Sequence, residues 1–443
     1  MSNRPARVPH PLVLLTGAVA VAAALTWILP PGQYERRENP ATGRTVVVAG
    51  TYHSVAPSPV GPFAAAVAIP RGFVAAADVV GVILFVGAAW VLIDGLGTLS
   101  AIVGAIVRRS KGRGLWMVPA VSLFFALMGA LENMQEEIIP LVPALLVLGA
   151  GIGVDAVVVV SMSAGAAMVG SAFGPTNPFQ AGIAMKLAEL PPLSGGGVRL
   201  SMLAAGVVIW IGWTMRYAAK TRVTQVIAAE AASVLPARHL LILGAMLTPM
   251  AAYVYGALSL GWGFNELSGV FVVGAAVAGL VGGLGVAGTV TAYVNGMVSL
   301  LPAAILVGLA RSVSLVLDDG KIIDTILYLL VTALAQMPAA AAALVMIPFH
   351  ALIHVAVPSV SGQAVLTMPL FVPLADVLGF SRQVPVLAYQ TGAGLMEMAT
   401  PTNGALMAIL LGAGVSFQRW LRFAFWGLVL LTLVGVLGIA VAR

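Results

Sequence analysis

The fold is decided by one short stretch and its repeat: Phe173-Gly174-Pro175-Thr176-Asn177 and Ala399-Thr400-Pro401-Thr402-Asn403. Each copy lies inside a long apolar segment, at about 156–190 and 384–415, where a membrane-spanning helix is otherwise expected. Proline has no amide proton and clashes with the preceding turn, so it interrupts such a helix. The two copies are 226 residues apart (177 to 403), about half of the 443-residue chain. The spacing therefore predicts two copies of one unit, each with a broken transmembrane helix.

The composition excludes a soluble protein. Hydrophobic residues make up 60% of the chain and charged residues only 9%, whereas about a quarter of an ordinary soluble domain is charged. The net charge of +6 comes from short basic clusters between apolar segments, which argues against nucleic-acid binding. The chain has no cysteine, so disulfides, thiolate metal sites and cysteine nucleophiles are excluded.

Seven further apolar segments are long enough to cross a bilayer: about 11–30, 73–94, 198–215, 238–260, 266–284, 290–316 and 420–441. We therefore expect an all-α polytopic membrane protein with about nine to eleven spans. Its predicted parts are a first transmembrane helix at 1–30, an extracytoplasmic loop at 31–72, repeat 1 at 73–216, a cytoplasmic linker at 217–238, a connecting helix at 239–265 and repeat 2 at 266–443.

The basic clusters predict the orientation, because Lys and Arg near span ends stay on the cytoplasmic side. They are Arg4/Arg7, the run 108–113, Arg216/Lys220/Arg222/Arg238 and Arg419/Arg422. If all four are cytoplasmic, the N-terminus is inside and the C-terminus is outside. The expected location is the bacterial cytoplasmic (inner) membrane.

The two units are predicted to have opposite orientations. Asp94-Gly95 and Asp319-Gly320 occupy similar positions, and each precedes an amphipathic run, at 96–107 and 321–334. The connecting helix places these runs on opposite sides of the membrane, as in inverted-repeat transporters. An apolar segment with a polar middle follows each run, at about 115–153 and 337–378, and we interpret both as re-entrant hairpins.

The breaks offer oxygen atoms to a small cation. Pro175 in one copy and Pro401 in the other free backbone carbonyls in the middle of a span, next to Gly174 and Thr400. Together with the side chains of Thr176, Asn177, Thr402 and Asn403, these carbonyls could bind a cation, and we predict a sodium site at Asn177, Asn403 and neighbouring backbone carbonyls. The N-termini of the half-helices that begin after each break would favour an anionic group. The alternative is a proline kink whose polar residues bond only to the helix backbone.

The hairpin tips carry the remaining candidate residues. Glu132, Asn133, Glu136 and Glu137 form the first tip, and Ser359, Ser361, Gly362 and Gln363 the second. Carboxylates at membrane depth are costly and mark functional sites, where they bind a proton, a cation or a substrate amino group. The alternative is a shallow hairpin whose glutamates meet water at the interface.

Other motifs are weaker. His350 and His354 share a helix face, as metal ligands can, but no third ligand is evident, and packing or a polar helix contact is the alternative. Asp94, Asp318 and Asp319 fit a functional role and helix capping equally well. No nucleophile–base set is visible, so we expect no enzyme.

Four motifs resemble the anaerobic four-carbon dicarboxylate carrier (DcuC-like) family in its YfcC-like branch: residues 136–140, 174–179, 361–369 and 401–404. The resemblance extends over nearly the whole chain. It implies membership of the ion transporter superfamily, with two inverted repeats, two re-entrant hairpins and an elevator mechanism. It also implies that the two tips and two breaks line the substrate and sodium sites.

We therefore expect a secondary active transporter of a small carboxylate or amino acid, coupled to sodium or protons, with no cofactor other than sodium ions. A homodimer is also expected. The alternative within this class is a cationic amino acid antiporter, favoured by the glutamate cluster. A passive channel and an intramembrane enzyme are remote alternatives.

Overall fold

The computed structural model describes residues 11–40, 43–99, 101–102, 105, 114–191, 193–222, 236–260 and 262–442. Within these residues, ten helical segments are long and apolar enough to span a bilayer. Six of them lie outside the predicted hairpins and broken helices: α1 (Pro11–Ile28), α3 (Ala77–Gly95), α10 (Gly196–Lys220), α12 (Phe264–Val281), α13 (Gly285–Asp319) and α19 (Phe417–Ala442). The predicted class, an all-α polytopic membrane protein, is confirmed.

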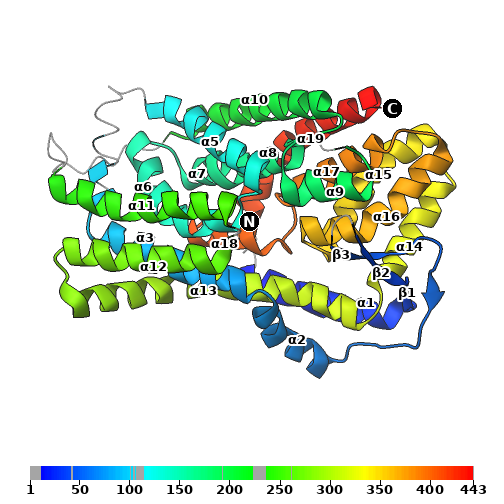
Figure 1. The fold of residues 1–443 in the computed structure, drawn as a ribbon, viewed down its shortest axis with the longest axis horizontal. Helices are drawn as coiled ribbons and strands as arrows, with labels where there is room; N and C mark the ends of the chain where they lie inside the picture. The colour runs from blue at the N-terminus through cyan, green and yellow to red at the C-terminus, as the bar shows by residue number, and fades with distance from the viewer. Residues whose placement is uncertain are drawn as a thin grey trace, which may run out of the picture.

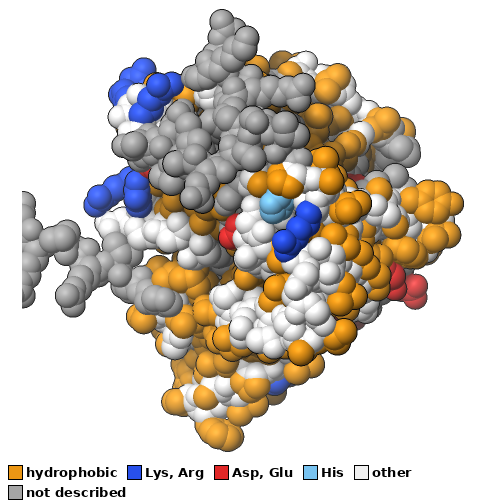
Figure 2. Space-filling model, turned by 90° about the vertical axis from the view of Figure 1, so that its left-hand side faces the viewer, with side chains coloured by type: hydrophobic (Ala, Val, Ile, Leu, Met, Phe, Trp, Pro, Cys, Tyr) orange, Lys and Arg blue, Asp and Glu red, His pale blue; other side chains and the backbone are white. Residues whose placement is uncertain are grey.

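The surface of these helices is apolar. Val208 on α10, Val273 on α12, Val298 on α13 and Leu437 on α19 are each between 63% and 70% exposed. Figure 2 views the left-hand end of the molecule in Figure 1 and shows hydrophobic side chains along the right-hand and lower parts, while Lys and Arg side chains gather at the upper left. Such a surface is suited to lipid tails and would be unfavourable in water.

The helices begin and end close to the predicted positions, with two differences. Helix α13 has 35 residues, longer than the predicted span at 290–316. The predicted loop at 31–72 ends in a helix, α2 (Pro62–Ala75). Pro62 suits the first turn of a helix and the residues after it are apolar, so the prolines and glycines of this segment misled the prediction. Helix α11 (Ala237–Ser259) occupies the predicted connecting helix.

The rest of the 31–72 segment is a small β structure bound to α14 (Ile323–Ala335). Strand β1 (Gly32–Gln33) pairs with β4 (His53–Ser54), and β2 (Arg36–Asn39) pairs with β3 (Arg44–Val47), both antiparallel. The buried Asp324 of α14 accepts the Tyr34 N–H at 2.9 Å and forms an ion pair with Arg36 at 3.0 Å. The Tyr52 ring stacks on Tyr328 of α14 at 4.1 Å between centroids. These contacts fix the outer loop to the helical body.

Each half contains a pair of helices that meet at a polar tip. The first pair is α5 (Met117–Glu132) followed by the 3₁₀ turn η2 (Glu136–Leu141) and α6 (Val142–Ile152). The second is α15 (Ala339–Ala356) and α16 (Val360–Leu378). Figure 1 shows α6 toward one end of the molecule, and α15 and α16 at the opposite end.

Each half also contains an interrupted helix. In the first half α7 (Ala156–Val160), the π-helical turn η3 (Ser161–Gly165) and α8 (Ala166–Phe173) lead to the break, after which η4 (Pro178–Gly182) and α9 (Ile183–Leu187) follow. In the second half α17 (Gln383–Met396) precedes the break and α18 (Gly404–Gly412) follows it.

The helices form two groups (Figure 1). Helices α1, α2, α11, α12 and α13 run along one side, and α5, α8, α10, α17 and α19 along the other. Helix α13 contacts α1, α2 and α12 of its own group as well as α3, and it also contacts α18, which begins just after the second break. The second break therefore lies between the two groups.

Several predicted features lie wholly or partly outside the described residues. They are Arg4 and Arg7, the basic run 108–113, part of the amphipathic run at 96–107 and most of the linker, at 223–235.

Candidate substrate and ion site

Asn177 closes the break in the first half. Its Oδ1 accepts the N–H groups of Phe179 and Gln180, both at 2.9 Å, and so caps the helix that restarts there. Its Nδ2 donates to Asn133 Oδ1 on the hairpin tip and to Ser171 Oγ, both at 3.0 Å. The buried Asn177 side chain therefore joins both ends of the break to the first hairpin.

Thr176 makes a second connection between the first break and its hairpin, because its Oγ1 donates to the Ala130 carbonyl at 2.9 Å. Thr176 and Glu132 are nevertheless exposed, and Pro175 is half-buried beside them. Polar side chains are not accommodated by lipid tails. We therefore expect the side chains of Thr176 and Glu132 to face a water-filled space and not lipid.

The second break has a similar arrangement. Asn403 Oδ1 accepts the Leu406 N–H at 3.2 Å, and Asn403 Nδ2 donates to the Glu397 carbonyl at 3.0 Å and to the Glu397 carboxylate. Thr402 Oγ1 donates to the Val355 carbonyl of the second hairpin at 2.9 Å and lies 2.7 Å from Thr400 Oγ1. In contrast to the first break, Thr400, Thr402 and Asn403 are all buried.

The hydrogen bonds of the two breaks correspond, except that one acceptor differs in chemical type. In each, the asparagine amide donates to a residue six positions earlier, and the threonine before it donates to a carbonyl near the end of the first hairpin helix. The residue six positions earlier is Ser171 in the first half and Glu397 in the second. The second break thus carries an ionisable group where the first carries a neutral hydroxyl.

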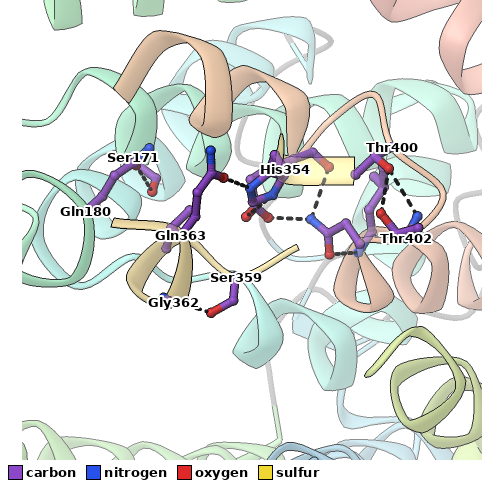
Figure 3. Close-up of polar contacts among 12 residues, drawn as sticks. Ser171, Gln180, His354, Ser359, Gly362, Gln363, Thr400 and Thr402 are labelled. Carbon is purple, nitrogen blue, oxygen red and sulfur yellow. Dashed lines mark hydrogen bonds and ion pairs between the residues drawn. The ribbon is translucent and has the colours of Figure 1, made fainter. Parts of the chain in front are cut away.

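The second hairpin contacts Glu397 through His354. Gln363 Oε1 lies 2.8 Å from His354 Nδ1, and His354 Nε2 lies 2.9 Å from Glu397 Oε1. All three side chains are buried. Figure 3 shows Gln363 pointing toward His354, with Gln180 and Ser171 on one side and Thr400 and Thr402 on the other. Ser359 Oγ accepts the Gly362 N–H at 3.2 Å and caps α16, whose first turn contains the half-buried Ser361 and Gly362.

Two glutamines join the halves. Gln180 Nε2 donates to the Gln390 carbonyl at 3.3 Å, and Gln390 Nε2 donates to the carbonyls of Ala172 and Gly174 at 3.4 and 3.3 Å. Gln390 Oε1 also accepts a bond from the buried Arg199 at 2.7 Å. The two interrupted helices are therefore bonded directly to each other.

The proposed sodium ligands are engaged in these bonds. Asn177 Oδ1 accepts two N–H groups, and Asn403 Oδ1 accepts one. The Ala172 and Gly174 carbonyls, which are freed at the break, accept from Gln390. Because such an oxygen has two lone pairs, a cation competes with existing hydrogen bonds at Asn177 Oδ1, where both lone pairs are used. The sodium site stays a prediction.

The first-tip glutamates are not equivalent. Glu132 is exposed, while Glu136 and Glu137 are half-buried. Glu137 Oε2 accepts the Gln135 N–H at 3.2 Å, and Glu136 lies close enough to Glu397 for the two carboxylates to interact electrostatically. An electrostatic interaction thus connects the first tip with the second break.

The sequence did not single out Glu397, Gln180, Gln390 or Ser171. The sequence could have identified Glu397, because it is a lone charged residue among apolar neighbours in a predicted span, and such residues are functional by default. The glutamines had none, since only the folded chain brings 180 and 390 together. Among the described residues no group of three His, Cys, Asp or Glu side chains is placed to hold a metal. His350 and His354 both lie near Gln363, at 3.4 and 2.8 Å.

Over residues 8–443 the sequence matches the family described as DcuC, C4-dicarboxylate anaerobic carrier. The chain belongs to this family. The predicted resemblance is confirmed, and so is the prediction that the protein is not an enzyme, because the DcuC family consists of membrane carriers.

The chain is also similar to individual known proteins. The chain is 29% identical over 371 residues to the "Putative basic amino acid antiporter YfcC" of Escherichia coli, covering 77% of this chain and 73% of that protein. It is 26% identical over 485 residues to an uncharacterised protein of Haemophilus influenzae, covering 96% and 95%. The crystal structure of the Alcanivorax borkumensis YdaH transporter covers 98% of each chain at 16% identity, with a TM-score of 0.43.

Proposed function

We propose that this DcuC-family protein is a secondary active transporter of a small carboxylate or amino acid across the cytoplasmic membrane, working by elevator-type alternating access. The observation that supports this best is the correspondence of the two breaks. Each asparagine joins a broken helix to a residue six positions earlier, and each threonine joins the break to its hairpin. Paired half-helices at the centre of two repeats are the usual place for a transported solute.

The arrangement of the helices supports the mechanism. The two hairpins lie toward opposite ends of the molecule, as an inverted repeat requires (Figure 1). The interrupted helices are bonded to each other through Gln180 and Gln390, so they form one unit. The group around α12 and α13 would be the fixed part against which this unit moves.

The acidic groups favour a second candidate, the exchange of cationic amino acids. Glu136 and Glu397 interact electrostatically, and a substrate ammonium or guanidinium near both would reduce their repulsion. The name of the Escherichia coli relative points to the same substrate class.

Uptake by purified protein in lipid vesicles separates the two candidates. Vesicles are loaded with buffer alone or with an unlabelled solute, and uptake of labelled succinate, fumarate, aspartate, lysine and arginine is measured with imposed sodium or pH gradients. Gradient-driven accumulation of a carboxylate supports the first proposal. Lysine or arginine uptake that needs an internal amino acid supports exchange, and the same flux for every solute without accumulation would refute both.

A further inference from the structure

Helices α10 and α19 enclose a groove on the exposed side of the molecule. They pack antiparallel, because a Cβ at Gly438 would meet Met202 at one end and the rings of Tyr217 and Phe423 lie 4.8 Å apart near the other. Helix α10 runs along the upper edge of the molecule in Figure 1. The groove has a volume of about 500 Å³, and its lining includes Val208, Gly212, Trp213, Arg216, Lys220 and Leu430.

The groove is apolar at one end and basic at the other. Val208, Gly212, Arg216 and Lys220 are spaced four residues apart, so they lie on one face of α10. At a rise of about 1.5 Å per residue, the helix extends about 18 Å from Val208 to Lys220. One leaflet contributes about half of the roughly 30 Å of hydrocarbon in a bilayer. The groove therefore has the length and the polarity of one phospholipid molecule.

The two cations of the groove lack a counter-ion. Arg216 and Lys220 are exposed, and no hydrogen bond or ion pair joins either side chain to another residue that the structure describes. Arg419, at the same end of the helix pair, differs because it pairs with Asp155 at 2.8 Å. Two unpaired cations one helical turn apart, next to an apolar groove, are suited to an anionic headgroup whose chains lie in lipid.

The groove is preformed. A Cβ at Gly212 would meet nothing within 4 Å, so this residue leaves the floor of the groove open. Trp213 Nε1 donates to the Phe423 carbonyl at 2.9 Å, which fixes the indole ring between the helices and satisfies its polar atom. Tryptophan rings and basic side chains are typical of the membrane interface. An acyl chain can therefore enter the groove without displacing a hydrogen-bonded group.

We propose that the α10–α19 groove is a binding site for one anionic phospholipid. The phosphate lies on Arg216 and Lys220, and an acyl chain follows Val208, Gly212 and Leu430. The two cations belong to a cluster that is expected on the cytoplasmic side, where anionic lipids are abundant. A second copy of this chain is the rival occupant, but apolar helices docked here would cover two cations without a counter-ion, which is costly.

A lipid in this groove would support both halves of the molecule. Helix α10 packs against α8, and α19 packs against α17, so the groove lies behind both interrupted helices. We therefore expect the lipid to stabilise the unit that contains the breaks, from a site separate from them.

Quenching by brominated lipids tests the site without any transported solute, so its result does not depend on the proposed transport function. Purified protein is placed in phosphatidylcholine vesicles in which a rising fraction of the lipid is brominated phosphatidylglycerol or, in parallel, brominated phosphatidylcholine. Bromine quenches the tryptophans that its acyl chain contacts, and the part of the quenching that is lost in Trp213→Phe comes from the groove. The two titrations give the association constant of the anionic lipid relative to the neutral one.

The cations should give the anionic lipid a clear preference. Each basic side chain beside an anionic headgroup should raise the association constant about fivefold, so the relative constant should be about 25 at low salt and fall as salt is added. Arg216→Gln combined with Lys220→Gln should reduce it to about 1. Arg222→Gln combined with Arg422→Gln is the matched control, because it removes the same charge from exposed residues outside the groove. A constant near 1 for the unmodified protein, or an equal fall in both double variants, would overturn the proposal.

Filling the groove provides the second readout. Gly212→Leu should remove most of the Trp213 quenching by both brominated lipids, whereas Gly269→Leu on α12, where a Cβ also meets nothing within 4 Å, should leave it unchanged. Unchanged quenching in Gly212→Leu would show that the lipid lies elsewhere. Absence of Trp213 quenching, in a protein that is dimeric in detergent by light scattering and monomeric as Gly212→Leu, would assign the groove to a second copy. Either result would overturn the lipid site.

Discussion

Gly170→Ala is expected to separate the first interrupted helix from the first hairpin. Helices α8 and α5 approach so closely that a Cβ at Gly170 would lie 1.9 Å from the Ala126 carbonyl oxygen, and a Cβ at Gly129 would lie 1.9 Å from the Ala167 carbonyl oxygen. Both obstacles are backbone atoms, which cannot rotate away. The ordinary limit for such a contact is 3.4 Å, so the helices must move apart by about 1.5 Å, the difference between the two distances.

This movement would break the bonds that hold the first break. The Thr176–Ala130 bond is 2.9 Å and the Asn177–Asn133 bond is 3.0 Å, and both would exceed hydrogen-bonding distance after a shift of this size. Overpacking costs about 1–3 kcal/mol and buried polar groups left without partners cost a further 1–3 kcal/mol. The free energy of unfolding should therefore fall by roughly 2–6 kcal/mol, and transport should be lost.

The fully buried Trp210 and Trp420, whose ring centroids are 6.2 Å apart, serve as a fluorescent probe in an SDS unfolding titration. Gly269→Ala on α12 is the matched control, because its Cβ meets nothing within 4 Å. Alanine in a helix is favoured over glycine, so this control should be neutral or stabilising by about 0.5–1 kcal/mol. Equal unfolding midpoints and equal uptake for Gly170→Ala and the control would refute the close-packing argument.

Three further outcomes are expected. Asn177→Ala and Asn403→Ala should each abolish uptake and lower the free energy of unfolding by about 1 kcal/mol through loss of a helix cap; near-normal uptake by both would contradict the assignment of the breaks. Single cysteines replacing Glu132 and Ser361 should react with an impermeant thiol reagent from opposite sides of the membrane, and reaction of both from one side would contradict the inverted repeat. Asp324→Asn should accelerate proteolytic cleavage in the outer loop, because it weakens the bonds to one backbone N–H and one guanidinium there; cleavage at the original rate would show that stacking alone holds the loop.

The sequence predicted the helices well because their signal is local. Some twenty apolar residues identify a span wherever it packs, and a Pro-Thr-Asn inside such a segment indicates its break. The C-terminal end of the 31–72 segment, where α2 begins, was the exception. There, Pro62 begins a helix instead of ending one, a distinction that depends on the residues that follow.

The site was less predictable because its bonds connect distant residues. The internal repeat located both breaks and both tips, but it drew attention to what the halves share. Glu397 is where they differ, so a search for matching motifs passed over it. The Gln180–Gln390 hydrogen bond depends on how the two interrupted helices cross. These helices lie so close that a Cβ at Gly394 would be 2.7 Å from Ala172, and no periodic sequence pattern indicates such a crossing.

The exchange of Ser171 for Glu397 has an energetic consequence for a carrier of the kind proposed. If the two halves were chemically identical, the states open to either side would be mirror images of equal free energy, and the empty carrier would rest in both equally. Glu397 and Ser171, which occupy corresponding positions in the two halves, remove this degeneracy. The two orientations of the empty carrier then differ in free energy, and the carrier rests mainly in one of them.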